Sequence, residues 1–387
     1  MPIFAPMNIG FDAKRAFQNS TGLGHYSRTL ISSLATFYPE NNYYLFAPKI
    51  TPLYNTNAFL NMHVVAPEHF PEKQFKSMWR SNWVKKDLVN NHIDIYHGLS
   101  HEIPVGISKT NIKSVVTIHD LIFERYPDQY NLIDRIIYNK KFRYACNNAD
   151  TIIAISEQTK QDIIEFYEIP EEKITVCYQS CNPAFNNIIT ESEKERVREY
   201  YKLPEEFYLY VGSIIERKNL LVICKALKQL NSPLPLVVIG NGGAYKQKIK
   251  QYIAVHNLQQ RVIFLSEQPE AVNSPAFQSA TDFPAIYQMA IAMIYPSIFE
   301  GFGIPVLEAL CSRLPVITSN VSCLPETAGD AAILIDPNDE KEMAAAMFAL
   351  ANNALLRKNL EEKGIIQAEK FSVKKCADAV MDVYKNL

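Results

Sequence analysis

The stretch Ala292-Met-Ile-Tyr-Pro-Ser-Ile-Phe-Glu300-Gly-Phe-Gly-Ile-Pro-Val-Leu-Glu308 contains a short apolar run, a glycine loop and the start of a helical pattern. The apolar run ends at Tyr295 and predicts a buried strand. Pro305 suits the first turn of a helix, because its missing N–H has no intrahelical partner there. A strand that leads through a glycine loop into a helix is typical of α/β domains with a parallel sheet.

The same rhythm recurs along the chain, so we predict an α/β fold with two doubly wound domains. A chain of 387 residues exceeds the usual size of one core, which favours two domains. We expect strands at 7–11, 43–47, 93–97, 115–118, 152–155 and 174–177 in the first half, and at 208–211, 236–239, 262–265, 292–295, 316–318 and 333–335 in the second.

A polar shift over 182–198 suits a linker between the two domains. We therefore place the domains at 1–188 and 189–371, and expect a C-terminal helix at about 372–387 to pack back on the first. Two such domains would face each other across a cleft. Ligands of open α/β sheets bind at the carboxyl ends of the strands, so functional residues are expected in those loops.

Composition excludes several classes of protein. Hydrophobic residues make up 48% and charged residues 21%, and the formal net charge of −2 predicts no nucleic-acid partner. The seven cysteines show no C-x-x-C pair, which indicates a reducing compartment rather than a disulfide framework. No apolar run approaches the roughly 18 residues that span a bilayer. We expect a cytoplasmic protein, with peripheral contact at the inner face of the membrane left open.

The glycine loop has the features of a phosphate site. Gly301 and Gly303 allow close approach of the backbone, and the N–H groups around Phe302 to Ile304, with the helix dipole, suit an anion. Glu300 and Glu308 could then accept hydrogen bonds from a sugar hydroxyl and a ribose. The alternative is a capped helix whose two acids are merely solvated.

This E-x7-E pattern, with its internal G-F-G and proline, resembles the signature of family 4 glycosyltransferases, which are retaining enzymes of the GT-B fold. The similarity extends to 115–122, 210–219 and 324–337, and is strongest to mannosyltransferase-type enzymes of bacterial surface polysaccharides. It implies a GDP- or UDP-linked sugar as donor, with GDP-mannose favoured, and a saccharide or lipid-linked saccharide as acceptor. No cofactor is implied.

His119 closes a predicted strand of the first domain. The resemblance implies that it contacts the transferred sugar near the reacting centre. The alternative is a buried histidine satisfied by Asp120.

Arg217 and Lys218 follow the first long strand of the second domain, where two cations would neutralise a pyrophosphate leaving group. The family commonly has an arginine directly after the glycine, where this chain has Ser213. Whether Arg217 replaces that arginine stays open, and a Lys-Arg pair is often just a solvated surface. No D-x-D, HExxH or His/Cys cluster is present, so we predict no catalytic metal.

Two further segments carry weaker signals. Gly22 and Gly24 lie between the first strand and a helical pattern, and the resemblance assigns them to a loop that closes over the donor phosphate; a plain turn is the alternative. Segment 70–89 holds Trp79 and Trp83 among several lysines. It could lie on anionic lipid, but the i,i+4 spacing favours a helix that packs on the sheet.

The chain also departs from the family pattern twice. A polar loop over 266–281 replaces a glycine turn, and its role is not readable from the sequence. Arg313 stands where a helix-ending glycine is common, which is expected to affect only capping. The rival functions are a nucleotide-sugar hydrolase, an epimerase, and a non-catalytic sugar-binding protein.

Overall fold

A computed structural model of the chain describes residues 5–230 and 234–387. It contains two compact units, the first running up to Cys181 and including Phe371–Leu387, the second spanning Asn182–Lys370. The sequence placed the boundary seven residues later, after 188. The difference arises because Pro183–Asn186 packs on the second unit, where the Phe185 and Tyr287 ring centroids lie 5.0 Å apart.

The first unit is built on a parallel sheet of seven strands in the order β3-β2-β1-β4-β5-β6-β7. Six of them confirm predicted strands to within three residues, whereas β3 was missed. The strands are β1 (Asn8–Asp12), β2 (Asn42–Phe46), β3 (Met62–Val65), β4 (Ile95–Gly98), β5 (Lys113–Ile118), β6 (Thr151–Ala154) and β7 (Ile174–Val176).

Both faces of this sheet are covered, which explains why its strands read as continuous apolar runs. Side chains alternate between the faces. Val115 and Ile153 join the core beneath α2 and α18, while Val116 and Ile152 join the core beneath α4, α6 and α7.

The first unit contains nine helices or π-helical turns and three 3₁₀ turns within the described residues. They are α1 (Lys14–Gln18), α2 (Gly22–Phe37), α3 (Lys76–Met78), the π-helical turn η1 (Trp79–Trp83), α4 (Val84–Asn90), α5 (Ile122–Arg125), α6 (Leu132–Asn148), α7 (Glu157–Tyr167), α18 (Val373–Lys385) and the 3₁₀ turns η2 (Ile107–Lys109), η3 (Pro127–Gln129) and η4 (Glu171–Lys173).

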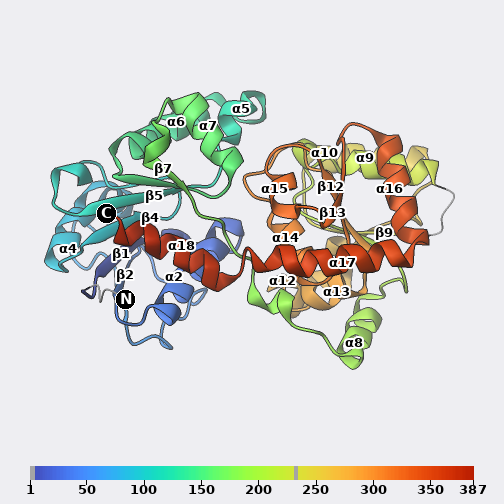
Figure 1. Ribbon diagram of the computed structural model, residues 1–387, viewed down its shortest axis with the longest axis horizontal. Helices are drawn as coiled ribbons and strands as arrows, with labels where there is room; N and C mark the ends of the chain where they lie inside the picture. The colour runs from blue at the N-terminus through green and yellow to red at the C-terminus, as the bar shows by residue number, and fades with distance from the viewer. Residues whose placement is uncertain (1–4, 231–233) are drawn as a thin grey trace. The chain divides into compact units, whose positions relative to one another are not determined.

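The C-terminal helix α18 lies beside α2 in the first unit (Figure 1). Its residues Ala377, Val380 and Met381 are almost completely buried in the core that β1 and α2 share. The second unit is therefore inserted between α18 and the rest of the first unit's chain.

The second unit holds a parallel sheet of six strands in the order β10-β9-β8-β11-β12-β13. All six confirm predicted strands, because each is a short apolar run in the sequence. They are β8 (Tyr208–Val211), β9 (Leu236–Ile239), β10 (Val262–Phe264), β11 (Ala292–Tyr295), β12 (Val316–Ser319) and β13 (Ala332–Ile335).

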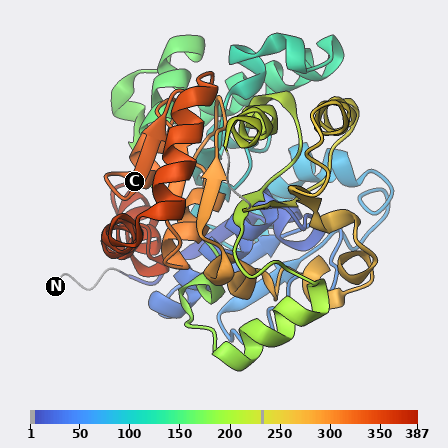
Figure 2. The ribbon, with the colours of Figure 1, turned by 90° about the vertical axis from the view of Figure 1, so that its right-hand side faces the viewer.

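The helices of this unit cover both faces of its sheet, and Figure 2 shows α8 on the outside, where it packs on α11 and α13. They are α8 (Glu191–Tyr201), α9 (Leu220–Gln229), α10 (Ala244–Val255), α11 (Pro269–Val272), α12 (Pro275–Gln278), α13 (Phe283–Met289), α14 (Ile304–Cys311), α15 (Leu324–Ala328), α16 (Glu340–Asn352), α17 (Ala354–Glu369) and the 3₁₀ turns η5 (Pro183–Asn186), η6 (Glu216–Lys218) and η7 (Leu265–Glu267).

Two sequence expectations on local structure change. Segment 266–281, expected as a polar loop, folds as part of η7 followed by α11 and α12, each of which begins with a proline. Arg313 takes the left-handed conformation, with φ of 60°, that a helix-ending glycine would adopt.

Segment 70–89 becomes helical only at Lys76, and its first tryptophan is fully buried. The Trp79 indole N–H donates to Asp87 at 2.7 Å, and the ring packs in the core with Leu88 and Tyr96. This segment therefore packs on the sheet, the alternative that the i,i+4 spacing favoured. Within the described ranges, no helix combines the length and apolar character needed to cross a bilayer.

Candidate active site

The candidate site of the second unit lies where its strand order reverses. β8 and β11 are neighbours in the sheet, although the strands β9 and β10 lie between them in the chain. Chain connections leave such a pair in opposite directions and open a crevice at the carboxyl ends of the strands. The loops after Val211 and Tyr295, which carry the predicted site residues, both begin at this edge.

The glycine loop after β11 has a fixed shape. Gly303 has φ of 92°, and a Cβ there would lie 2.8 Å from Leu324 Cδ2, so glycine is required. Ser322, two residues before α15, holds the loop, because its hydroxyl donates to the Glu300 carbonyl at 2.8 Å and accepts from the Glu300 N–H at 3.1 Å. Thr327 donates to the Phe302 carbonyl.

The loop leads into α14, whose first residue is Ile304 and whose first turn holds Pro305. The opening N–H groups of a helix lack intrahelical partners and attract anions. Gly301 and Phe302 are buried beside this helix start. The structure therefore brings the glycine residues and the helix start together as the sequence predicted.

Glu300 is the centre of a buried charge cluster. Its Oε1 atom lies 3.1 Å from Arg217 Nη1 and 3.2 Å from Lys218 Nζ, and accepts hydrogen bonds from Ser297 at 2.7 Å and Tyr295 at 2.9 Å. Within residues 5–230 and 234–387, no contact to Oε2 is recorded. The contacts of Oε1 thus hold the carboxylate in place, and Oε2 can accept a hydrogen bond from a ligand.

The charges around Glu300 fix its ionisation. Burial alone would raise the pKa of this carboxyl, but Lys218 and Arg217, with the Ser297 and Tyr295 hydrogen bonds, lower the pKa to about 2. Glu300 is therefore an anion throughout the physiological range.

Arg217 and Lys218 come from η6 and are themselves fixed. Arg217 also donates to the Phe299 carbonyl, and Lys218 to the Tyr295 hydroxyl. Ser213 is exposed in the same loop, and its carbonyl accepts from Tyr210 at 3.1 Å. Arg217, not Ser213, thus contributes the side chain that reaches the cluster.

Glu308 lies one turn into α14 and is half-buried. Its Oε2 accepts a 2.8 Å hydrogen bond from the Tyr287 hydroxyl of α13. Burial raises the pKa of Glu308 to about 7, against the opposing effects of that hydrogen bond and of Lys218. The two acids of the motif thus differ, since Glu300 is ionised and Glu308 titrates near neutrality.

His119 follows β5 in the first unit and is buried. Its Nε2 lies 2.9 Å from the Leu99 carbonyl, which can only accept, so Nε2 carries the ring proton and Nδ1 is an acceptor. Burial lowers the pKa of His119 to about 4. The ring is therefore neutral at physiological pH and is satisfied through Leu99, whereas Asp120 accepts from the Ile122 N–H.

A chain of buried hydrogen bonds leads to His119 from α18. His97 Nδ1 lies 2.6 Å from the Tyr384 hydroxyl, and His97 Nε2 lies 2.7 Å from Thr117 Oγ1. Thr117 Oγ1 lies 3.0 Å from the Tyr26 hydroxyl, and the Tyr26 ring meets His119 edge-on at 4.6 Å between centroids. Sequence reasoning did not predict this series of hydrogen bonds, since its residues are far apart in sequence.

The two glycines of the first unit differ in kind. A Cβ on Gly24 would lie 1.8 Å from the Asn19 carbonyl oxygen, so this glycine is required for the turn before α2. Gly22 is exposed at the first position of α2, with no atom within 4 Å of a Cβ. Only Gly22 has room for a ligand.

Sequence reasoning also missed a second glycine loop of the second unit, Gly240-Asn-Gly-Gly243, which joins β9 to α10. A Cβ on Gly242 would lie 2.2 Å from the Ile214 carbonyl oxygen, so this loop touches the one that carries Arg217. The sequence did carry a signal for this loop, because its glycines lie between an apolar run and a helical pattern.

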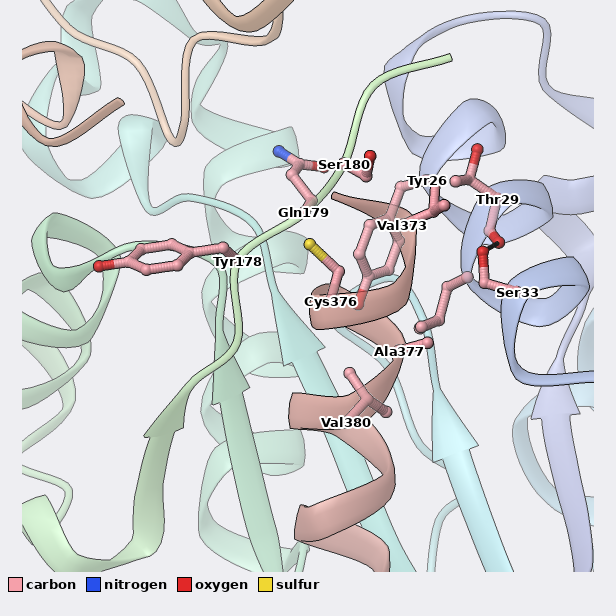
Figure 3. A pocket seen from close by; sticks show the side chains of 11 residues that line it. Tyr26, Thr29, Ser33, Tyr178, Gln179, Ser180, Val373, Cys376, Ala377 and Val380 are labelled. Carbon is pink, nitrogen blue, oxygen red and sulfur yellow. Dashed lines mark hydrogen bonds between the residues drawn. The ribbon is translucent and has the colours of Figure 1, made fainter. Parts of the chain in front are cut away.

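A small hollow in the first unit lies where α2, residues 178–180 and α18 meet (Figure 3). Thr29 and Ser33 line it from α2, and Cys376 and Val380 from α18. Its volume of about 10 Å³ admits roughly one water molecule, so it is no substrate site. Among the residues that the structure describes, no group of three metal-ligating side chains occurs.

Two parallel-sheet units and a phosphate-type loop at a strand-order reversal define the GT-B class of enzyme. Two family models match the chain, Glycosyltransferase Family 4 over residues 22–185 and Glycosyl transferases group 1 over residues 191–367. The chain belongs to these glycosyltransferase families, and it is a glycosyltransferase.

Known proteins agree with this assignment. The chain is 26% identical to the O-antigen chain mannosyltransferase B of Escherichia coli over 313 residues, which cover 80% of this chain and 77% of that protein. A glycosyltransferase from Rickettsia africae has the same fold, with a TM-score of 0.74, 18% identity and 99% of both chains covered. Anabaena HepE, solved with UDP and glucose, has a TM-score of 0.73 and 15% identity, covering 98% of this chain and all of that one.

Proposed function

We propose that the chain is a retaining hexosyltransferase that moves mannose from GDP-mannose to a saccharide or lipid-linked saccharide hydroxyl in surface polysaccharide synthesis. The observation that carries the donor site is the Glu300 cluster, in which two cations and a carboxylate meet beside a glycine loop at the strand-order reversal. Mannose is favoured by the similarity to a mannosyltransferase.

The residues have separate roles in this proposal. The α14 N-terminus and Gly301 to Gly303 receive the pyrophosphate, which Lys218 and Arg217 neutralise as charge develops on it. Oε2 of Glu300 accepts from a hydroxyl of the transferred sugar. Glu308 accepts from the ribose, because a carboxylate is a good acceptor for a diol.

His119 contacts the transferred sugar in this proposal. Since its Nδ1 carries no proton, it accepts a hydrogen bond from a sugar hydroxyl rather than acting as a cation. Gly22 leaves room for the donor phosphate and the acceptor.

The bond changes balance without a metal or a protein nucleophile. The acceptor oxygen forms a bond to the anomeric carbon on the face that the phosphate leaves, and the anomeric C–O bond breaks. The departing β-phosphate takes the acceptor's proton, and the nucleoside diphosphate is released. Lys218 and Arg217 supply the positive charge that the leaving group needs.

The first experiment is a thermal-shift panel with GDP, UDP, GDP-mannose, UDP-glucose and UDP-N-acetylglucosamine, because a ligand of the native state raises apparent stability. We expect the largest shift with GDP-mannose, and a smaller shift in Glu308→Gln. A shift confined to UDP-sugars would exclude mannose transfer from GDP. NMR of the product then shows whether the anomeric configuration is retained, and EDTA-treated enzyme should keep its activity.

Donor loss without acceptor separates the rival activities. A hydrolase would release sugar at the same rate with and without acceptor, and an epimerase would change the sugar while it stays linked to the nucleotide. We expect free sugar and epimerised nucleotide sugar each to form at no more than a few per cent of the rate of transfer.

A further inference from the structure

The first two turns of α6 carry an unusual cluster of exposed aliphatic side chains. Leu132, Ile133, Ile136 and Ile137 are exposed by 66, 71, 60 and 43%. Single exposed apolar residues are normal, but four in six positions form a patch that water solvates poorly. We name these four residues the α6 patch.

Helix geometry places the α6 patch on one face. Residues at i, i+1, i+4 and i+5 lie side by side, so the four side chains share one side of the helix. The opposite side, with Phe142, Ala145 and Cys146, is buried in the core of the first unit. The patch is therefore not needed to attach α6 to its own sheet.

Cations continue along the same outward side of the helix. Lys140, Lys141 and Arg143 are exposed in the turns after the patch, where Lys141 pairs with Glu102 and Arg143 donates to the Phe166 carbonyl. The one acid of α6 is Asp134, which is half-buried and caps the helix start with Asn131. The outward side is thus apolar first and then positive, which complements an anionic bilayer with an apolar interior.

The α6 patch follows the carboxyl end of β5, the part of the first unit that carries His119. The chain passes from the carboxyl end of β5 through His119 and α5 before α6 begins. Lys141 lies 3.2 Å from Glu102, which pairs with Arg80 at 2.9 Å, and Arg80 binds Asp12 at the carboxyl end of β1. Figure 1 shows α5, α6 and α7 grouped on one side of this unit.

We propose that the α6 patch docks the protein on an anionic lipid bilayer, with the four aliphatic side chains among the acyl chains and Lys140 at the headgroups. Segment 70–89, the sequence candidate for lipid contact, does not fit this role, because Trp79 is buried in the core. The docking is independent of the donor chemistry, and it would bring a lipid-linked acceptor to the edge that carries His119.

Co-sedimentation of the full chain with vesicles tests the proposal without any turnover. Vesicles of 70% phosphatidylcholine and 30% phosphatidylglycerol should bind the protein, and pure phosphatidylcholine should bind it several-fold less. Ile133→Gln with Ile136→Gln should lower the partition coefficient about tenfold or more, because two apolar anchors are lost. Lys140→Gln should reduce binding about two- to fivefold, and only at low salt.

The matched control is Leu355→Gln with Ile366→Gln on α17, which removes two side chains of similar exposure, 78 and 66%, from the second unit. It should bind vesicles like the wild type. Equal vesicle binding by the α6 variant and the wild type would overturn the proposal, as would a wild type that binds no vesicles.

A wild-type dimer in light scattering that the α6 substitutions convert to a monomer would show that a second copy covers the patch instead. Failure of the proposed transfer is a separate result, since a protein without mannosyl transfer can still bind vesicles. Unchanged thermal unfolding of the α6 variant confirms that lost binding does not reflect lost folding.

Discussion

The Tyr384 hydroxyl lies 2.6 Å from Nδ1 of His97, although 287 positions separate the two residues. Both side chains are buried, and His97 bonds onward to Thr117. The helix α18 is therefore joined to the middle of the first sheet by a polar contact as well as by apolar packing. A buried hydrogen bond of this kind favours one position of the helix on the sheet over others.

Tyr384→Phe should destabilise the first unit by about 1–3 kcal/mol, because it leaves His97 Nδ1 buried without its partner. Denaturant unfolding followed by tryptophan fluorescence measures this, since Trp79 and Trp83 both belong to the first unit. Tyr138→Phe is the control, as that side chain is 37% exposed, and it should cost less than 0.5 kcal/mol. Equal effects of the two changes would contradict the role of the His97 contact.

The first unit should lose stability in acid before the second. Burial lowers the pKa of His97 to about 3 and of His119 to about 4. Each folded pKa lies below the unfolded value, so the stabilisation is complete above pH 6.5 and is lost as the pH falls through the folded pKa. His119 alone accounts for about 3 kcal/mol.

The second unit contrasts with this, because its buried acid Glu300, with a pKa of about 2, stays ionised until far lower pH. Tryptophan fluorescence between pH 7 and 4 should therefore change before far-ultraviolet circular dichroism is fully lost. A far-ultraviolet circular dichroism signal that is fully lost before the tryptophan fluorescence changes would be evidence against this order.

Nucleotide affinity should rise with pH through neutrality. Burial raises the pKa of Glu308 to about 7, so its neutral form stabilises the free protein at low pH and that stabilisation is lost as pH rises through 7. A ribose that donates to the carboxylate favours the ionised form, which gives about a tenfold gain in affinity between pH 6 and 8. Calorimetry should show this dependence in the wild type and a flat, weaker profile in Glu308→Gln.

Glu300→Gln should lower transfer at least 100-fold and destabilise the second unit by about 3 kcal/mol, because it leaves Arg217 and Lys218 without their counter-charge. Transfer rates and thermal unfolding measure the two effects. Glu362→Gln, on the exposed side of α17, is the charge-matched control and should change neither quantity. A fully active, stable Glu300→Gln enzyme would remove the central residue of the proposed donor site.

The two glycines in the first turn of α2 should respond differently to alanine. Gly24→Ala places a methyl group against the Asn19 backbone and should cost at least about 2 kcal/mol. Gly22→Ala meets no atom within 4 Å, and its cost should stay within about 0.5 kcal/mol. A stable Gly22→Ala protein with a raised KM for donor would therefore report ligand contact, whereas unchanged kinetics would limit this loop to a structural turn.

Most of the fold could be predicted because parallel strands with two buried faces read as short apolar runs. The missed strand, Met62–Val65, lies at the sheet edge, and its exposed His63 interrupts the apolar signal. The predicted boundary after 188 lies too late, because residues 182–186 read as part of a linker in the sequence. In the structure they attach to the second unit through one buried ring, Phe185. Such tertiary contacts leave little trace in local composition.

The sequence predicted that Glu300, Arg217 and Lys218 would lie near the glycine loop, but not how burial and neighbouring charges set their ionisation. The spacing of Glu300 and Glu308 marked both acids, yet their pKa values diverge because only Glu300 has two cations beside it. Likewise, the Leu99 carbonyl, 20 positions earlier, determines which ring nitrogen of His119 carries the proton. Burial and long-range partners set these properties.

The return of α18 to the first unit also orders events during synthesis. The ribosome must make roughly 190 further residues after Cys181 before that helix emerges, which takes on the order of 10–40 s. For that time the apolar side of β1 and α2 lacks its cover, while the inserted second unit can already fold. The nascent first unit therefore keeps this apolar surface exposed until α18 has been made.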